Sequence, residues 1–213
     1  PARGAHDLCW LYQRKLFRSS ALILVPSKSI KEMVEREIGI PAAYFTRGVD
    51  SKAFSPENGN RQDGRHPKTL YAGRISVEKN LQLLEKLDLP EGEHMVFVGD
   101  GPYADTLANS MPRARFTGFL RGIDLQEAYA SADIFVFPSK TDTFGNAVLE
   151  AMAAGLPVVV TNVLGPKDFV RHGETGFIAE TDEEFVRYHR RLLEDRKLRE
   201  EMSANARAYA LTR

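Results

Sequence analysis

Short apolar runs alternate with segments of helical spacing along most of the chain after residue 68. The apolar runs occupy residues 70–75, 95–98, 115–118, 134–137, 158–161 and 176–179. Between most of them, apolar residues recur at helical spacing over residues 80–87, 104–109, 125–131 and 146–154. Strands that alternate with helices predict a Rossmann-like α/β domain with an open parallel sheet and helices on both faces. We place this domain at residues 69–213, with two charged helices near its end that meet at Asp195.

A smaller pattern of the same kind precedes it. Residues 10–18 have helical spacing, and the continuous apolar run 21–25 predicts a buried parallel strand. Ser27 is a suitable N-cap for a helix that Gly39 would end, and residues 42–46 predict a second strand. We expect residues 1–53 to be the last βαβ of a second Rossmann-like domain, and the chain to be a fragment cut at both ends.

The stretch between the two patterns has the composition of a linker. Residues 55–68 contain no aliphatic side chain but two prolines and two glycines, so we predict a linker over 54–68.

Composition narrows the functional classes. The 29 acidic and 29 basic residues cancel, which disfavours a nucleic-acid-binding protein. The single cysteine, Cys9, excludes a disulfide framework, and the five histidines lack metal-ligand spacing, so we expect no metal site. The chain has no apolar run of about 18 residues, so a membrane span is not expected and a cytoplasmic location is the default.

Three candidate residues follow the predicted strands, where an open α/β sheet binds its ligands: Arg74, Lys79 and Asp142. A fourth, Glu150, lies near the middle of the helix predicted over 146–154. Arg74 and Lys79 suit a phosphate or diphosphate, although two solvated surface cations would give the same pattern. Glu150 lies among apolar neighbours and would need a partner or ligand if buried; a ribose or sugar diol fits a carboxylate. A capping Asp142 and an exposed Glu150 remain the alternative.

Gly99 and Gly101, with Ala104, match the dinucleotide fingerprint G-x-G-x-x-A after a strand. The match lies on the second strand of its domain, and Pro102 removes an N–H group that a pyrophosphate could use. A tight turn is the favoured interpretation.

Longer motifs resemble a known family. Residues 71–80 (YAGRISVEKN), 98–102 (VGDGP), 116–119 (FTGF) and above all 137–159 (FPSKTDTFGNAVLEAMAAGLPVV) resemble the retaining GT-B glycosyltransferases of the large group 1 type, family 4. Its members have two facing Rossmann-like domains, of which the C-terminal one holds most of the nucleotide sugar.

The resemblance implies a role for each candidate residue. Glu150 would hold the ribose, Asp142 the donor sugar, and Arg74 with Lys79 the diphosphate leaving group. Further donor contacts would come from Gly73, Gly99, Gly101, Phe119, Leu120, Thr143, Phe144, Gly145 and Asn146, with Phe119 and Leu120 at the base. The family has two glutamates at the positions of Asp142 and Glu150. Because Asp142 is one methylene shorter than glutamate, the resemblance leaves the identity of the donor sugar open.

The resemblance also implies the reaction. A sugar passes with retention from a nucleoside-diphosphate sugar, without metal or cofactor, to an acceptor such as a lipid or glycan. The N-terminal domain would supply the acceptor side and any peripheral membrane contact, so activity of this chain alone is left open. Three alternatives remain: a phosphorylase or nucleotide-sugar epimerase of this fold, a non-catalytic nucleotide-binding module, and a dinucleotide-binding dehydrogenase domain.

Overall fold

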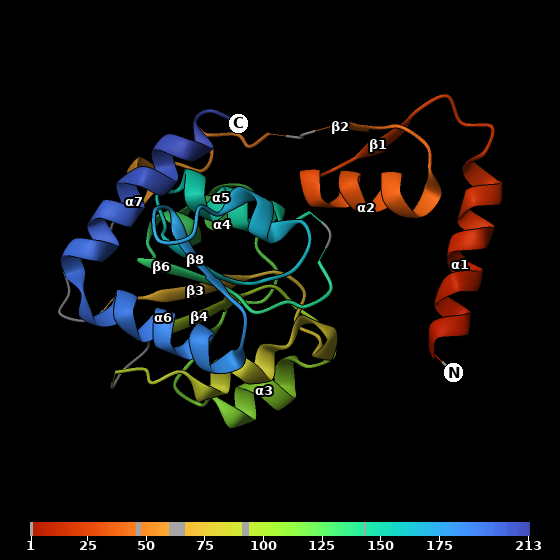
Figure 1. Cartoon of the computed structure of the whole chain (residues 1–213). Coiled ribbons are helices and arrows are strands. Elements are labelled where there is room, and N and C mark those ends of the chain that lie inside the picture. The colour runs from red at the N-terminus through yellow and green to blue at the C-terminus, as the bar shows by residue number, and fades with distance from the viewer. Residues whose placement is uncertain (1, 46–47, 60–66, 91–93, 143) are drawn as a thin grey trace. The chain divides into compact units, whose positions relative to one another are not determined.

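The chain divides into two compact units, Pro1–Arg47 and Gly48–Arg213. The computed structural model describes residues 2–45, 48–59, 67–90, 94–142 and 144–213, and side chains from residue 8 onward (Figure 1). Each unit is considered by itself.

The first unit contains α1 (Ala2–Phe17), β1 (Ile23–Val25), α2 (Lys28–Ile38) and β2 (Ala42–Tyr44). The two strands pair in parallel, with Ile23 opposite Ala42. The ends of α2 follow the predicted capping: the Ser27 hydroxyl accepts from the Ile30 N–H, and Gly39 ends the helix at φ 76°. Val25, Ile30, Val34, Ile38 and Ala42 form its small core.

The second unit is built on a parallel sheet. Its described strands, in the spatial order β5-β4-β3-β6-β7-β8, form a six-stranded sheet. Their bounds are β3 (Thr69–Ala72), β4 (Met95–Val98), β5 (Arg115–Phe116), β6 (Ile134–Phe137), β7 (Val158–Thr161) and β8 (Gly176–Ala179). The predicted open parallel sheet is confirmed. The central strands β3, β6 and β7 are buried at every residue, which explains why they read as continuous apolar runs.

Helices cover both faces of this sheet. Figure 1 shows α4 (Gly122–Ala130) and α5 (Asn146–Ala153) on one side of the strands, with α3 (Ala104–Ser110) and α6 (Asp182–Glu194) on the other. The last helix, α7 (Arg196–Ala210), contacts α5 and α6. The predicted break at Asp195 is confirmed, and its carboxylate accepts from the Leu198 N–H to begin α7.

The helix predicted over 80–87 is present as a 3₁₀ helix and not as an α-helix. Over that range the structure has a 3₁₀ helix, η3 (Leu81–Lys86), which follows another short 3₁₀ helix, η2 (Val77–Lys79). Asn80 separates them in the left-handed conformation, at φ 56°, and its side-chain amide donates to the Pro138 carbonyl. A left-handed residue cannot continue a helix, so Asn80 ends η2, and η3 buries Leu81, Leu83 and Leu84.

Residues 54–59 of the predicted linker pack within the second unit, against α4. The Phe54 ring meets the Tyr129 ring edge-on at 5.2 Å between centroids, and η1 (Pro56–Asn58) contacts α4. A Cβ at Gly59 would lie 2.6 Å from the Ala130 backbone, so only glycine allows this approach. The polar composition of this stretch does not predict the packing, because the packing depends on a few specific contacts with residues distant in the sequence. Residues 60–66 lie outside the described chain.

The strand order places a crevice at one edge of the sheet. The connections run outward in opposite directions from β3 and β6, which are neighbours in the sheet. Such a switch point leaves an opening beyond the carboxyl ends of the strands, where open α/β sheets bind ligands.

Candidate functional site

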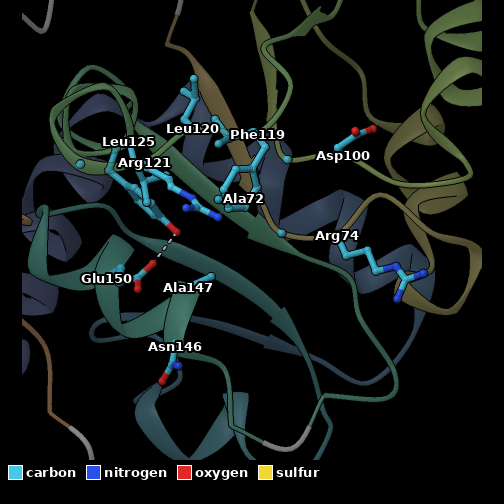
Figure 2. Close-up of a pocket in the computed structure, with 15 residues that line it drawn as sticks. Ala72, Arg74, Asp100, Phe119, Leu120, Arg121, Leu125, Asn146, Ala147 and Glu150 are labelled. Carbon is cyan, nitrogen blue, oxygen red and sulfur yellow. Dashed lines mark hydrogen bonds between the residues drawn. The ribbon is translucent and has the colours of Figure 1, made fainter.

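A cavity of about 650 Å³ opens at this edge of the sheet (Figure 2). Its walls come from the ends of β3 and β4, the loop before α4, and the facing sides of α4 and α5. The lining residues are Ala72, Gly73, Arg74, Val98, Gly99, Asp100, Phe119, Leu120, Arg121, Gly122, Leu125, Tyr129, Asn146, Ala147 and Glu150. Much of this wall is apolar, and a few polar groups converge on it, as in a small-molecule site.

Glycines let the loops after β3 and β4 touch. A Cβ at Gly99 would lie 2.0 Å from the Gly73 carbonyl oxygen, and one at Gly101 would lie 2.2 Å from the Ile75 carbonyl oxygen. Gly73 and Gly99 line the cavity, whereas Gly101 does not. Loop packing thus accounts for the glycines of the G-x-G-x-x-A pattern.

Glu150 is half-buried in the cavity wall and has a partner. The Tyr129 hydroxyl donates to Glu150 Oε2 at 2.9 Å, and Figure 2 shows this bond across the gap between α4 and α5. Burial raises the pKa of Glu150, while the Tyr129 hydrogen bond acts in the opposite direction. The alternative of a freely exposed glutamate is therefore wrong.

Arg74 and Arg121 are the arginines of the cavity wall. The buried Tyr71 hydroxyl donates to the Arg74 carbonyl at 2.9 Å and fixes this turn. The Arg121 guanidinium lies 4.8 Å from the centre of the Phe119 ring. Figure 2 shows Arg74 at the edge of the cavity, with its side chain directed away from Glu150.

Lys79 and Asp142 form an ion pair beside the cavity. Their Nζ and Oδ2 atoms are 2.5 Å apart, and each side chain is only about one-fifth exposed, 21% and 22%. Burial raises the pKa of Tyr71, and the charges of Asp142 and Glu78 add to this effect. The structure thus joins Lys79 to Asp142, and neither residue lines the cavity.

The remaining candidates lie around the start of α5. Asn146 lines the cavity at the first residue of the helix. Gly145 precedes it at φ 78°, and a Cβ there would lie 3.0 Å from Pro166 Cα. The Phe144 ring packs against Phe169 at 5.9 Å between centroids, so Phe144 and Gly145 support this helix start. Thr143 lies outside the described residues.

Sequence reasoning identified Phe119 and Leu120 in the cavity wall but missed Asp100, Arg121, Leu125 and Tyr129. Leu125 and Tyr129 are four residues apart on α4 and share a face, which is a detectable signal. That this face meets Glu150 depends on the packing of α4 against α5 and could not be read from spacing.

The described residues contain neither a candidate metal cluster nor a helix that could span a membrane. In that part of the chain, no group of three or more His, Cys, Asp or Glu side chains is placed to hold a metal ion. No helix within those residues has both the length and the apolar character needed to cross a bilayer. Metal independence stays a prediction.

Comparison with known proteins identifies the family. Residues 55–209 match the family model described as "Glycosyl transferases group 1". The sulfoquinovosyl transferase SQD2 of Arabidopsis thaliana is 39% identical over 221 residues, covering 93% of this chain and 42% of the relative. A GDP-mannose-dependent alpha-mannosyltransferase of Mycobacterium tuberculosis is 36% identical over 177 residues, covering 79% of this chain and 46% of the relative. The chain thus spans less than half the length of these two relatives.

A solved structure has the same fold. The Anabaena protein HepE, in a crystal structure with UDP, superposes with a TM-score of 0.81 at 20% identity. The match covers 97% of this chain and 64% of HepE. The chain belongs to the glycosyl transferases group 1 family and has the Rossmann-like α/β fold of GT-B glycosyltransferases.

Proposed function

We propose that this chain carries the donor site of a retaining glycosyltransferase, which moves a sugar from a nucleoside-diphosphate sugar to an acceptor hydroxyl. The observation that carries the proposal is the half-buried Glu150 in a cavity at the switch point of the sheet, across from the Arg74 turn. Glycosyltransferase names among the relatives support the reaction class.

The cavity offers a separate partner to each part of a nucleoside diphosphate. Phe119, Leu120 and Leu125 provide apolar surface for a base. Glu150 Oε2 accepts from Tyr129, which leaves acceptor capacity on the carboxylate for ribose hydroxyls. Arg74 provides positive charge for the diphosphate once its side chain turns inward, and an exposed arginine can turn freely.

Lys79 and Asp142 suit the sugar end of the donor. A lysine ammonium has three donors, so Lys79 can keep its bond to Asp142 and still reach a phosphate oxygen. Asp142 has further lone pairs for sugar hydroxyls. Together with Arg74, Lys79 would stabilise the negative charge that grows on the departing diphosphate, which is the main electrostatic task in this transfer.

The donor site is tested by calorimetric titration of the 213-residue chain with UDP, GDP and ADP, with NAD as a control. We expect saturable binding of at least one diphosphate and at least tenfold weaker binding in Glu150→Gln. Glu201→Gln, an exposed glutamate on α7, is the matched control and should bind as the wild type does. Binding that is unchanged in Glu150→Gln would contradict the proposed site.

Retention and independence from metals and cofactors belong to the same proposal and need the full-length enzyme. The anomeric configuration of the product, followed by NMR from the start of the reaction, should match that of the donor. Activity should also persist in excess EDTA. An inverted product or loss of activity with EDTA would overturn these two parts separately.

We further propose a lipid or glycan acceptor and a cytoplasmic enzyme that contacts the membrane through its N-terminal part. Support comes from α1, which carries Arg14 and Lys15 in its last turn and leaves Leu8, Leu11 and Leu16 more than half exposed. Co-sedimentation with vesicles containing anionic lipid should decrease when Leu11 and Leu16 are replaced by serine. Equal sedimentation with neutral vesicles, or none, would contradict membrane contact.

A further inference from the structure

We propose that Tyr129 is a positioning residue of the donor site, whose hydroxyl holds one oxygen of Glu150 so that the carboxylate presents its other oxygen to the ribose. This proposal rests on the proposed function, because it assumes that Glu150 binds the ribose hydroxyls. Tyr129 is a buried residue outside the two pairs already discussed, the acids Asp142 and Glu150 and the cations Arg74 and Lys79.

The Tyr129 ring is held in place. Only 1% of the residue is exposed. Its ring contacts the Phe54 ring edge-on, with centroids 5.2 Å apart, and stacks on the Phe135 ring, with centroids 5.8 Å apart. With aromatic rings of two other segments against it, Tyr129 has no room to turn away. Its hydroxyl is therefore a fixed donor in the wall of the cavity.

Glu150 depends on such a donor. The carboxylate projects from the middle of α5 into a partly apolar wall, and a half-buried carboxylate without a hydrogen bond is costly to keep ionised. The Tyr129 hydroxyl has one hydrogen and directs it at Oε2, 2.9 Å away. A carboxylate fixed at one oxygen loses little further freedom when it binds a diol, which favours tight and specific binding.

Tyr129 and Glu150 lie where a ligand in the cavity would meet them. Tyr129 and Glu150 line the same cavity, and their bond joins α4 to α5 across it. A tyrosine that only filled the core would not need its hydroxyl at this surface, and phenylalanine would replace it without consequence for a ligand. The hydroxyl and the ring can therefore be tested separately.

The experiment compares ribose recognition in matched variants. Dissociation constants of UDP, GDP and ADP and of their 2′,3′-dideoxy forms are measured for the wild type, Tyr129→Phe, Glu150→Gln and the double variant. The control is Tyr103→Phe, because the Tyr103 hydroxyl also donates to a glutamate, Glu85 Oε1 at 3.4 Å, but lies outside the cavity.

We expect the wild type to bind a ribonucleotide more tightly than its dideoxy form. Tyr129→Phe should reduce that preference about tenfold, the usual scale for a hydrogen bond to a charged group, and leave dideoxy binding unchanged. The double variant should have no less preference than Glu150→Gln alone, because the hydroxyl acts through the carboxylate. Tyr103→Phe should keep the wild-type preference.

The contrary results are separable. An unchanged preference in Tyr129→Phe, or equal loss of both ligand forms, would overturn the positioning role and leave the donor site standing. Equal binding of both forms by the wild type, or no binding, would overturn the ribose role of Glu150 itself and with it the positioning proposal.

Discussion

At the scale of single residues, Glu150 combines two opposing effects. Its carboxylate is suited to ribose hydroxyls, yet burial raises its pKa, so ionisation opposes folding of the ligand-free chain. A carboxyl group whose pKa is higher in the folded than in the unfolded state stabilises the fold at low pH. That stabilisation is lost as the pH rises through the folded pKa.

Glu150→Gln should therefore stabilise the ligand-free chain at neutral pH. Glutamine cannot ionise and can still accept the Tyr129 hydrogen bond. We expect its melting temperature to exceed that of the wild type at pH 7.5, and the difference to vanish near pH 4, where an ordinary glutamate is protonated. Melting followed by circular dichroism at both values tests this, with Glu201→Gln as the control. A variant less stable than the wild type at pH 7.5 would contradict it.

The sequence predicted that Glu150 would need a partner if buried, but it did not identify that partner. Apolar neighbours on both sides indicated that the carboxylate would need a partner if buried. The partner, Tyr129, is 21 residues earlier and on another helix, so only the packing of α4 on α5 brings them together. The ion pair of Lys79 and Asp142, 63 residues apart, was hidden for the same reason.

At the scale of elements, the loops after β3 and β4 support each other through glycine. Replacing Gly99 by alanine puts a Cβ 2.0 Å from the Gly73 carbonyl oxygen, at a φ of 128° that alanine rarely adopts. The neighbouring turn, which carries Arg74, would have to move. We expect Gly99→Ala to lower the free energy of unfolding by about 2 kcal/mol or more and to weaken nucleotide binding strongly.

Gly118→Ala is the control for this prediction. Gly118 also has a positive φ, 71°, but a Cβ there would meet nothing within 4 Å. It should cost only about 1 kcal/mol of conformational strain. Urea unfolding and nucleotide titration of both variants provide the comparison, and equal effects would show that the close approach at Gly99 does not hold the turn.

Helices and strands could be predicted where the local sequence alone determines their position. Continuous apolar runs located the strands, and capping residues located the ends of α2. The 3₁₀ helix η3 was predicted as a regular helix over 80–87, because nothing in the local spacing indicates that Asn80 is left-handed or that its side chain donates to the Pro138 carbonyl, 58 residues away. Apolar spacing carries no trace of that contact.

At the scale of the whole second unit, Arg207 joins parts that are distant in sequence. From α7 its guanidinium donates to the carbonyls of Ser51, at 3.0 Å, and Phe54, at 2.7 Å, and also to that of Ala153 at the end of α5. Composition suggested an open linker after residue 53, since polar residues, proline and glycine give no sign of a distant arginine. These bonds hold the start of that stretch to the folded unit.

Arg207→Ala should therefore destabilise the unit as a whole. Several partly buried carbonyls would lose their donor, and we expect the free energy of unfolding to fall by about 2–4 kcal/mol. Limited proteolysis should also cut faster within residues 48–59. Arg190→Ala, which removes an exposed pair with Asp88, should change neither. Unchanged cleavage and stability in Arg207→Ala would contradict this role.

The central claim is that the cavity between Arg74 and Glu150 is the site of a nucleoside diphosphate. A crystal structure of the chain with the diphosphate that binds most tightly tests it most directly. We predict the ribose hydroxyls on the free oxygen of Glu150, the base against Phe119 and Leu120, and the diphosphate within reach of Arg74 and Lys79. A nucleotide bound elsewhere, or bound here with its ribose away from Glu150, would contradict the account.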